Sequence, residues 1–293
     1  TRAERAARHD CDPLTVSHSD AQPIDPWGFA VKPVSALSNI VRRTLDHRFR
    51  GEVIRKARYK LRDQLERADR ASSVAWCRKH AEDPAEWAKA IDADAWTRAT
   101  AFAAGHVAHA RDLLTGAASS LGGGGFPALL YFLVRLRRPT RVVETGVAAG
   151  HSSRAILRAL FANEHGHLWS SDLPYFTLND AETLIGVLVE NPLKSRWTLM
   201  TEGDRRCLPA ILSEATPIDL LHYDSDKSRE GRSFAWSVVA PHLSPDALVL
   251  FDDIQDNGHF RDLTRTANNF HVFSFARKWV GLIDMRTAGS LNG

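Results

Sequence analysis

The segment Arg141-Val-Val-Glu-Thr-Gly-Val-Ala-Ala-Gly-His-Ser-Ser153 constrains the fold more than any other part of the chain. A β-branched run ends at Glu144, and two glycines separate it from a stretch that favours a helix. Gly146 can adopt a positive φ or let the backbone approach a ligand, and Gly150 permits close packing of the helix against the strand. A strand, a glycine-containing turn and a helix in this order are typical of a nucleotide-cofactor turn in an α/β protein.

The spacing of the glycines restricts the kind of cofactor. A dinucleotide fingerprint reads G-x-G-x-x-G and seats a pyrophosphate on the helix N-terminus. This turn reads E-x-G-x-x-x-G and has Ala148 at the second glycine position. Glu144, just before the first glycine, would repel a phosphate and suit a cation. The turn therefore disfavours a nicotinamide-dependent oxidoreductase and favours a cationic ligand without phosphate.

Beyond Arg141, strand patterns alternate with helix patterns. Strands are predicted at 141–145, 167–172, 197–201, 218–224, 247–252, 272–275 and 280–284. Helices are predicted from residue 152 and near 180–190, 205–212, 231–240 and 260–268. This alternation predicts an α/β fold with a doubly wound, mostly parallel sheet that binds ligands at the carboxyl ends of its strands. The two closely spaced strands at the end predict an antiparallel final hairpin.

Each of the first five predicted strands ends at or next to an acidic residue. These residues are Glu144, Asp172, Asp204, Asp224 and Asp252. An acid after a strand often caps the next helix, so none of them identifies a site alone. Together they line the edge of the sheet where a cofactor should lie. Asp172 is placed to accept hydrogen bonds from both hydroxyls of a ribose, and Asp204 lies where an adenine edge would pass.

Acidic residues are densest in His222-Tyr-Asp-Ser-Asp-Lys227 and in Phe251-Asp-Asp253. Asp224, Asp252 and Asp253 follow neighbouring predicted strands and could converge as oxygen ligands for Mg²⁺. Adjacent carboxylates otherwise raise each other's pKa, and a cation would keep them ionised. In the structural alternative, Asp252 accepts hydrogen bonds from loop amides and Asp253 caps a helix.

Four stretches in order along the chain resemble the bacterial class I S-adenosylmethionine-dependent methyltransferases of the methyltransferase-24-like family. They cover residues 142–157, 171–174, 219–227 and 251–257, within a similarity over about residues 120–285. This family is also similar to macrocin-type sugar and catechol-type metal-dependent O-methyltransferases. The resemblance implies a Rossmann-like methyltransferase sheet of seven strands with the last strand antiparallel. It also implies S-adenosyl-L-methionine as cofactor and, in the metal-dependent relatives, Mg²⁺.

The resemblance also implies roles for individual residues. The cofactor-binding set is Glu144, Gly146, Gly150, Ser152, Asp172, Asp204 and Asp224, and the metal-binding set is Asp224, Asp252 and Asp253. The second acid of the D-x-D motif serves as a base in some sugar enzymes, which implies that role for Asp226. This chain departs from them in having Ser225 where those enzymes usually have glycine.

The expected reaction is O-methylation of a small-molecule hydroxyl of a sugar or natural product. Histidines near strand ends are further candidates for the base, and His259 is the first of them to test. The sequence does not identify the acceptor, because no motif marks the part of the chain that would contact it.

Pattern and composition predict three parts along the chain. The sequence predicts an irregular arm over residues 1–33, a helical N-terminal extension over residues 34–120 and the methyltransferase domain over residues 121–293. In the extension, Asp83 is placed to cap a helix that has Pro84 in its first turn. The run Leu121-Gly-Gly-Gly-Gly-Phe-Pro127 predicts either a flexible connector or a mobile lid beside the cofactor.

The extension is basic within a chain of net charge +3. Between Arg42 and Arg70 there are eleven Arg and Lys residues against five Asp and Glu. These helices suggest an alternative function: a non-catalytic protein of methyltransferase fold that binds nucleic acid, lipid or protein through them. No aromatic residues alternate with the charges as in a nucleic-acid surface, so a solvated, salt-bridged helix face is the favoured interpretation.

Other features set expectations about location and partners. The chain has no apolar run of about 18 residues, so we expect no membrane span. Its three cysteines are widely spaced and no signal pattern follows Thr1, which leads us to expect a cytoplasmic protein. The amphipathic extension is compatible with a homodimer.

Overall fold

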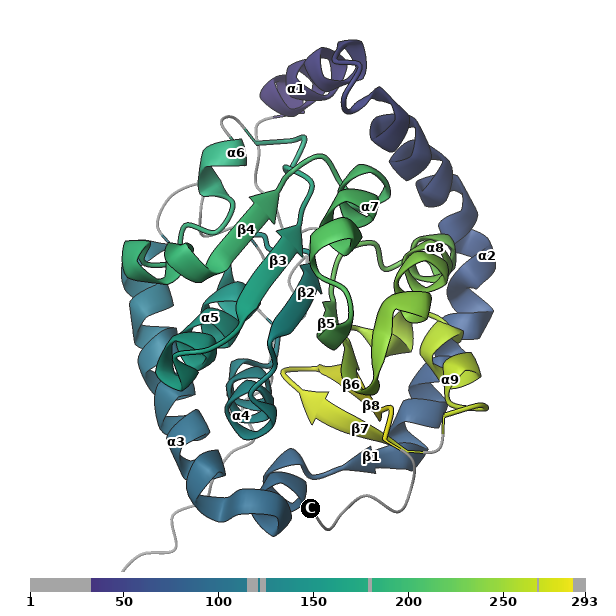
Figure 1. The fold of residues 1–293 in the computed structure, drawn as a ribbon. Helices are drawn as coiled ribbons and strands as arrows, with labels where there is room; N and C mark the ends of the chain where they lie inside the picture. The colour runs from purple at the N-terminus through teal and green to yellow at the C-terminus, as the bar shows by residue number, and fades with distance from the viewer. Residues whose placement is uncertain (1–32, 115–120, 122–124, 179–180, 268, 287–293) are drawn as a thin grey trace, which may run out of the picture. The chain divides into compact units, whose positions relative to one another are not determined.

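A mixed sheet of eight strands organises the described part of the computed structural model, which comprises residues 33–114, 121, 125–178, 181–267 and 269–286 (Figure 1). The strands are β1 (Ala81–Glu82), β2 (Arg141–Thr145), β3 (His167–Ser171), β4 (Trp197–Met200), β5 (Ile218–Tyr223), β6 (Leu243–Phe251), β7 (Phe270–Phe275) and β8 (Lys278–Asp284). Their order in the sheet is β1-β7-β8-β6-β5-β2-β3-β4. β8 is antiparallel to both of its neighbours, and the remaining pairs are parallel.

The predicted fold class is confirmed, with one strand more than the seven expected. All seven predicted strands form, and β8 is the antiparallel one. The additional strand is β1, which pairs with β7 through the registers Ala81↔Val272 and Glu82↔Phe273. Two residues between long helices give no periodic pattern, so sequence reasoning missed this strand.

The predicted extension forms three helices. These are α1 (Pro33–Leu45), α2 (Arg50–His80) and α3 (Pro84–Leu113). The predicted cap of α3 is present, because Asp83 accepts hydrogen bonds from the backbone N–H groups of Ala85 at 2.7 Å and Glu86 at 2.9 Å. α3 is interrupted at Asp92, whose φ of −157° and ψ of 98° are not helical. Its carboxylate accepts a hydrogen bond from Ala95 N at 2.8 Å and so caps the second half.

Helices cover both faces of the sheet. The remaining α-helices are α4 (Pro127–Arg137), α5 (His151–Asn163), α6 (Ala181–Leu184), α7 (Asp204–Glu214), α8 (Arg229–Val239) and α9 (His259–Leu263). The described residues also form three 3₁₀ turns, η2 (Asn191–Arg196), η3 (Ala240–His242) and η4 (Ile254–Asp256). In Figure 1, α3, α4 and α5 lie together on one side of the sheet, whereas α7, α8, α9 and α2 lie on the other.

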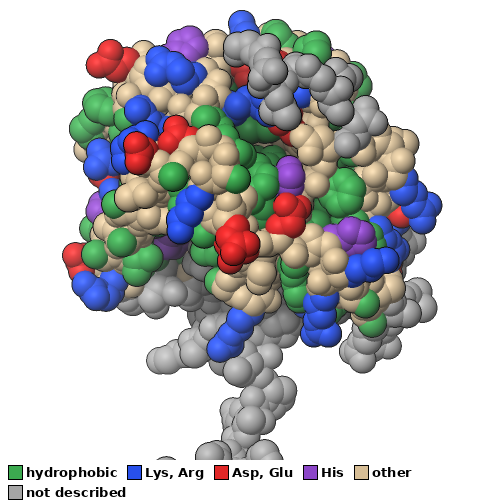
Figure 2. Space-filling view, turned by 90° about the horizontal axis from the view of Figure 1, so that it is seen from below, with side chains coloured by type: hydrophobic (Ala, Val, Ile, Leu, Met, Phe, Trp, Pro, Cys, Tyr) green, Lys and Arg blue, Asp and Glu red, His purple; other side chains and the backbone are tan. Residues whose placement is uncertain are grey.

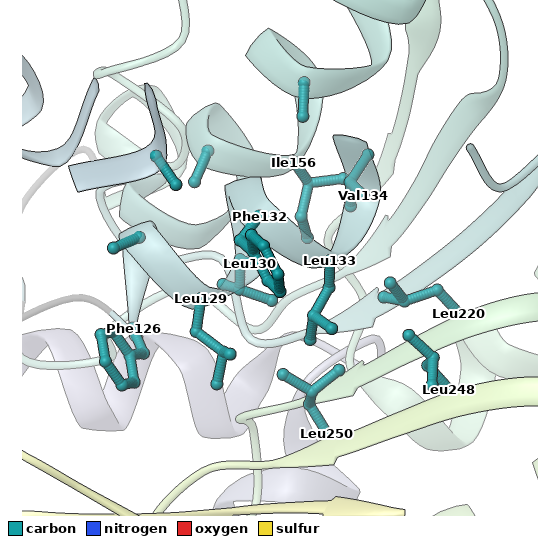
Figure 3. Close-up of a cluster of buried hydrophobic side chains, with 14 of the residues drawn as sticks. Phe126, Leu129, Leu130, Phe132, Leu133, Val134, Ile156, Leu220, Leu248 and Leu250 are labelled. Carbon is teal, nitrogen blue, oxygen red and sulfur yellow. The ribbon is translucent and has the colours of Figure 1, made fainter. Parts of the chain in front are cut away.

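Apolar side chains of α4 fill the larger core (Figure 3). Phe132 and Leu129 are 0% exposed, and they pack in one cluster with Ile156 of α5 and with Leu220 and Leu250 of the sheet. A second cluster on the opposite face joins α7 and α8 to the sheet and includes Cys77 of α2. The central strands β2 and β5 are therefore buried on both faces, as in other parallel sheets.

The connection from β3 to β4 is less helical than predicted. The helix expected near 180–190 is reduced to the four residues of α6, which η2 follows. Gly186 N donates a hydrogen bond to the carbonyl of Ala148 at 2.8 Å, and a Cβ on Gly186 would lie 2.3 Å from the Trp197 ring. A continuous helix over residues 180–190 would not let Gly186 approach Ala148 and Trp197 so closely. These contacts hold the connection between β3 and β4 against the turn after β2.

The described residues from Pro33 onward belong to one compact unit. The predicted irregular arm, apart from Pro33, and the glycines 122–124 lie outside the described residues. Among the helices that the structure describes, none combines the length and apolar character that crossing a bilayer requires. Figure 2 shows basic, acidic and apolar side chains interspersed on the face seen from below.

Candidate functional site

The predicted cofactor turn is the segment 146–150 between β2 and α5. It lies at the switch point of the sheet, because β2 pairs with β3 on one side and with β5 on the other. Gly146 has φ of +83°, and a Cβ there would lie 2.6 Å from the carbonyl oxygen of Asp224. Gly150 has φ of +93°, and a Cβ there would lie 2.9 Å from Gly186 Cα. Gly150 thus allows close approach of the chain after α6, in addition to the predicted helix packing. Ala148 is also left-handed, with φ of +48°.

Glu144 lies beneath this turn and is 0% exposed. Its Oε2 accepts hydrogen bonds from Ser153 Oγ at 2.6 Å and from Ser170 Oγ at 2.8 Å. Its Oε1 lies 3.4 Å from Nδ1 of buried His222, and neither atom has a hydrogen-bond partner within the described part of the chain. The carboxylate therefore ties α5 to β3, and its contact with the cofactor stays a prediction.

The acids that follow β3 and β4 lie beside the turn. Asp172 Oδ2 accepts a hydrogen bond from Ala148 N at 3.0 Å, which holds its carboxylate next to the cofactor turn. Asp204 accepts hydrogen bonds from Ser171 Oγ at 2.5 Å and from Ser225 Oγ. Burial raises the pKa of Asp204 despite these hydrogen bonds. Both oxygens of Asp204 are thus engaged by hydroxyls of the neighbouring strand ends.

Ser152 is the second residue of α5 and is 2% exposed. It follows Gly150, so its backbone N–H belongs to the free first turn of the helix. That position suits the carboxylate of an amino-acid ligand. Its role in binding stays a prediction.

Asp224, Asp252 and Asp253 converge as predicted. Each offers one carboxylate oxygen, and these oxygens lie within 4.8 Å of one another. Hard oxygen ligands are those that Mg²⁺ prefers, so the donor set fits this ion. Asp253 has φ of +51°, a left-handed conformation that turns its carboxylate toward its neighbours. Of the structural alternative, the part about Asp252 is confirmed, because its Oδ1 accepts a hydrogen bond from Asp253 N at 3.0 Å. The part about Asp253 is not supported, because its side chain makes no capping bond to the described turn η4.

Two lysines lie within this acidic cluster and were missed from the sequence. The Lys227 ammonium contacts Asp224 and lies 3.0 Å from Asp253 Oδ2, and the Lys278 ammonium contacts Asp252. Burial would raise the pKa of Asp253, but attraction by both lysines lowers it to about 2. The sequence could have indicated the contact of Lys227 with the cluster, because Lys227 follows Asp224 by three residues. It gave no such indication for Lys278, because only the final hairpin brings it to this edge.

Arg232 of α8 supports the Asp252–Asp253 turn from below. Its side chain is 0% exposed, and Nη2 donates to the carbonyl oxygens of Asp252 at 3.0 Å and Asp253 at 2.8 Å. These two bonds fix the peptide units that carry the two carboxylates. A buried arginine on α8 gave no signal in the sequence.

The two predicted bases have different surroundings. Asp226 contacts the Arg55 guanidinium of α2 and accepts a hydrogen bond from Ser228 N at 3.0 Å, at the N-terminus of α8. His259 is 6% exposed, and burial together with the positive charge of Arg232 lowers its pKa to about 4. Both carry structural contacts, and for both the role of base stays a prediction.

A pair of histidines connects α3 to the cofactor turn. His106 is 2% exposed, and its Nε2 lies 2.9 Å from Nδ1 of His151, the first residue of α5. Arg154 Nη1 lies 2.9 Å from His106 Nδ1. Because arginine can only donate, His106 accepts at Nδ1 and donates from Nε2 to His151. Burial, with the charges of His151 and Arg154, lowers the pKa of His106 to about 4.

This neutral histidine predicts a loss of stability in mild acid. As the pH falls from about 6.5, the unfolded chain takes up a proton that folded His106 refuses until about pH 4. The stability that neutral His106 contributes is therefore complete above about pH 6.5 and is lost as the pH falls toward 4. We expect the slope of the unfolding free energy against pH to decrease by about 1.4 kcal/mol per pH unit at most in His106→Gln.

Urea unfolding of both proteins at pH 7.5, 6.0 and 5.0 measures this slope. The difference in unfolding free energy between the two proteins at pH 7.5 gives the effect of lost packing in His106→Gln, because His106 takes up no proton on unfolding at that pH. Parallel curves for the two proteins across this range would contradict the assignment.

A family model of known proteins supports the class of domain. Residues 143–254 match the methyltransferase-24 family model, described as a methyltransferase domain. This match confirms the resemblance over that segment, which contains the cofactor turn and Asp172, Asp224, Asp252 and Asp253. No curated protein matches this chain.

Solved structures with a similar fold include three methyltransferases. The O-methyltransferase from Bacillus cereus, in complex with SAH, is 15% identical with a TM-score of 0.49, over 60% of this chain and 90% of that chain. TomG from Streptomyces achromogenes, an O-methyltransferase involved in tomaymycin synthesis and in complex with SAM, is 16% identical with a TM-score of 0.46, over 76% and 99%. A methyltransferase from Geobacter sulfurreducens is 17% identical with a TM-score of 0.44, over 63% and 88%.

Proposed function

We propose that this protein transfers the methyl group of S-adenosyl-L-methionine to a hydroxyl oxygen of a small molecule, such as a sugar or another natural product. The observation that carries the proposal is the convergence of acids from β2, β3 and β5 on one E-x-G turn at the switch point of the sheet. The family match over residues 143–254 supports the same class of reaction.

The residues of the turn would bind and orient the cofactor. Asp172 would accept hydrogen bonds from the ribose hydroxyls, and the first turn of α5 at Ser152 would bind the amino-acid carboxylate. Gly146 would let the backbone approach the ligand, and buried Glu144 would hold the turn in place. Holding the two reactants together can contribute roughly 7–11 kcal/mol to a bimolecular displacement, so orientation would be the main contribution of the protein.

Asp224, Asp252 and Asp253 would hold Mg²⁺ where the reaction requires it. When bound, the ion would lower the pKa of the acceptor hydroxyl. The two lysines in the cluster would compete with it, because Lys227 and Lys278 already offset two of the three negative charges. We therefore propose to test whether methyl transfer requires Mg²⁺ by measuring turnover with and without the ion.

The proton of the acceptor hydroxyl would pass to a group beside the acidic cluster. Asp226 and His259 are the bases proposed from the sequence. Lys227 would instead stabilise the negative charge that develops on the acceptor oxygen, because its ammonium lies between the carboxylates of Asp224 and Asp253. The Asp226 carboxylate is held in an ion pair with the guanidinium of Arg55.

The helical extension would belong to this enzyme and would not serve as a separate binding module. Its arginines Arg43 and Arg55 pair with Glu182 and Asp226 of the chain itself, which leaves them unavailable to phosphates. Val41 and Leu45 are 53% and 82% exposed on α1 and would suit contact with a second copy of the chain. We retain the three-part division at residues 33 and 120 as a proposal.

Isothermal titration calorimetry of S-adenosylhomocysteine into the purified protein tests the proposed function. We expect saturable binding at one site per chain, with or without Mg²⁺, because the proposed cofactor residues other than Asp224 lie outside the acidic cluster. A screen of hydroxyl acceptors with and without EDTA would then decide the metal requirement. If no heat of binding is observed in either buffer, the methyltransferase assignment fails, and the alternative of a non-catalytic binding protein is favoured.

A further inference from the structure

The bend between α1 and α2, residues 43–55, contacts the loop after each of the strands β3, β4 and β5. At the β3 loop, the Arg43 guanidinium forms an ion pair with Glu182, and Arg43 is 6% exposed. Phe49 is 2% exposed, and its ring lies edge to face with that of Phe176 at 6.1 Å. The bend is therefore packed on the loop that carries Asp172.

At the β4 loop, the contact is made by Glu52, which is 9% exposed. A Cβ on Gly203 would lie 3.7 Å from Cγ and 3.8 Å from Cδ of Glu52, and 3.4 Å from Leu173 Cδ1. Glu52 and Leu173 thus both lie close to the point where a side chain on Gly203 would project, beside the ends of β4 and β3.

At the β5 loop, Arg55 joins the bend to the strand ends. Its Nε donates to Glu52 Oε2 at 3.1 Å, and its guanidinium also contacts Asp226. Arg55 therefore orients the Glu52 carboxylate and holds α2 against the loop that follows β5. Two donors of the guanidinium thus bind the same Glu52 oxygen, Oε2, and a third binds Asp226.

The loops after β3 and β4 are those between which the adenine of the proposed cofactor would lie, beyond the ribose at Asp172. Asp204 is the acid of the β4 loop, but both of its oxygens already accept hydrogen bonds from Ser171 and Ser225. Glu52 is the other carboxylate packed against this loop at Gly203. An acceptor at this place suits the exocyclic amino group of adenine, which has two N–H donors.

We propose that the α1–α2 bend forms the outer wall of the adenine end of the cofactor site, with Glu52, oriented by Arg55, accepting the hydrogen bond from the adenine amino group. This inference rests on the proposed function, since it assigns part of the S-adenosylmethionine site. It makes the extension, which matches no part of the methyltransferase family model, a determinant of cofactor specificity.

The test compares S-adenosylhomocysteine with S-inosylhomocysteine, which has a carbonyl oxygen in place of the adenine amino group. We expect the wild-type protein to bind the inosine analogue about 10- to 100-fold more weakly, because Glu52 then faces an acceptor. In Glu52→Gln the amide can donate to that oxygen, so the preference should largely disappear. Asp46→Asn is the matched control, since Asp46 lies in the same bend and pairs with Arg48 of the bend itself.

Each outcome of the calorimetry decides one point. If the wild type binds neither ligand, both the proposed function and this inference fail. If the wild type binds both ligands equally, the inference alone fails, and this result needs no variant to fold. A preference that survives in Glu52→Gln at an unchanged melting temperature would also overturn the role of Glu52. Loss of the preference in Glu52→Gln, with retention in Asp46→Asn, supports it.

Discussion

Replacing Asp224 by Asn is expected to reduce methyl transfer by about 100- to 1000-fold while leaving S-adenosylhomocysteine affinity within about threefold of wild type. Asp224 contributes a carboxylate to the cluster with Asp252 and Asp253, and it contacts Lys227. Loss of this charge would weaken the hold of the cluster on Mg²⁺ and on Lys227, the cations that would stabilise the reacting oxygen by several kcal/mol. Each 1.36 kcal/mol corresponds to a tenfold change in rate. The Asn side chain has nearly the same shape, so the fold should be retained.

Asp219→Asn is the matched control for this experiment. Asp219 lies on the same strand, β5, but at its opposite end, where it accepts hydrogen bonds from the backbone of Thr140 at 2.8 Å and Arg141 at 2.9 Å. That variant should lose some stability and keep its activity per folded molecule. Wild-type turnover in Asp224→Asn would refute the catalytic role of the cluster, whereas a parallel loss of cofactor affinity would assign Asp224 to cofactor binding.

Gly146→Ala should weaken S-adenosylhomocysteine binding by tenfold or more and also destabilise the protein. The backbone conformation, with φ of +83°, is strained for alanine by about 1–3 kcal/mol. The added Cβ would also lie 2.6 Å from the carbonyl oxygen of Asp224, so the turn or the end of β5 must move. Both movements change the edge of the sheet where the cofactor is proposed to bind.

Gly105→Ala provides the control for the general effect of adding a methyl group. Gly105 lies in α3, and a Cβ there would meet nothing within 4 Å. Alanine at that helical position should stabilise the protein by up to about 1 kcal/mol. Chemical denaturation and calorimetry of both variants measure the two effects. Equal affinities and stabilities in the two variants would show that the turn tolerates a side chain at residue 146.

Much of the sheet was predictable because buried parallel strands have strong local signals. The run before Glu144 is β-branched, and it forms β2 at the predicted residues. The strand-end acids were predictable for the same reason, since the carboxyl ends of parallel strands share one edge. The convergence of Asp224 with Asp252 and Asp253 follows from the pairing of β5 with β6.

Other parts of the site depend on contacts between distant segments, which leave no local pattern. Lys278 reaches Asp252 only through the final hairpin, and Arg55 reaches Asp226 across 171 positions of the sequence. The helix predicted near 180–190 is short because Gly186 packs against Trp197. That contact becomes evident only when β4 is placed beside β3. Tertiary packing of this kind overrides a helical pattern in the sequence.

The two residues of β1 bear on the order in which the chain folds. Ala81 pairs with Val272, far along the sequence, so the edge of the sheet at β7 gains its last neighbour from a segment that is synthesised long before β7. During synthesis, α2 and α3 emerge long before the strand that joins them to the sheet. Closing so long a loop is slow compared with local helix formation. We therefore expect the core around α4 and α5 to form first and the extension to dock in a late step, after translation has passed residue 275.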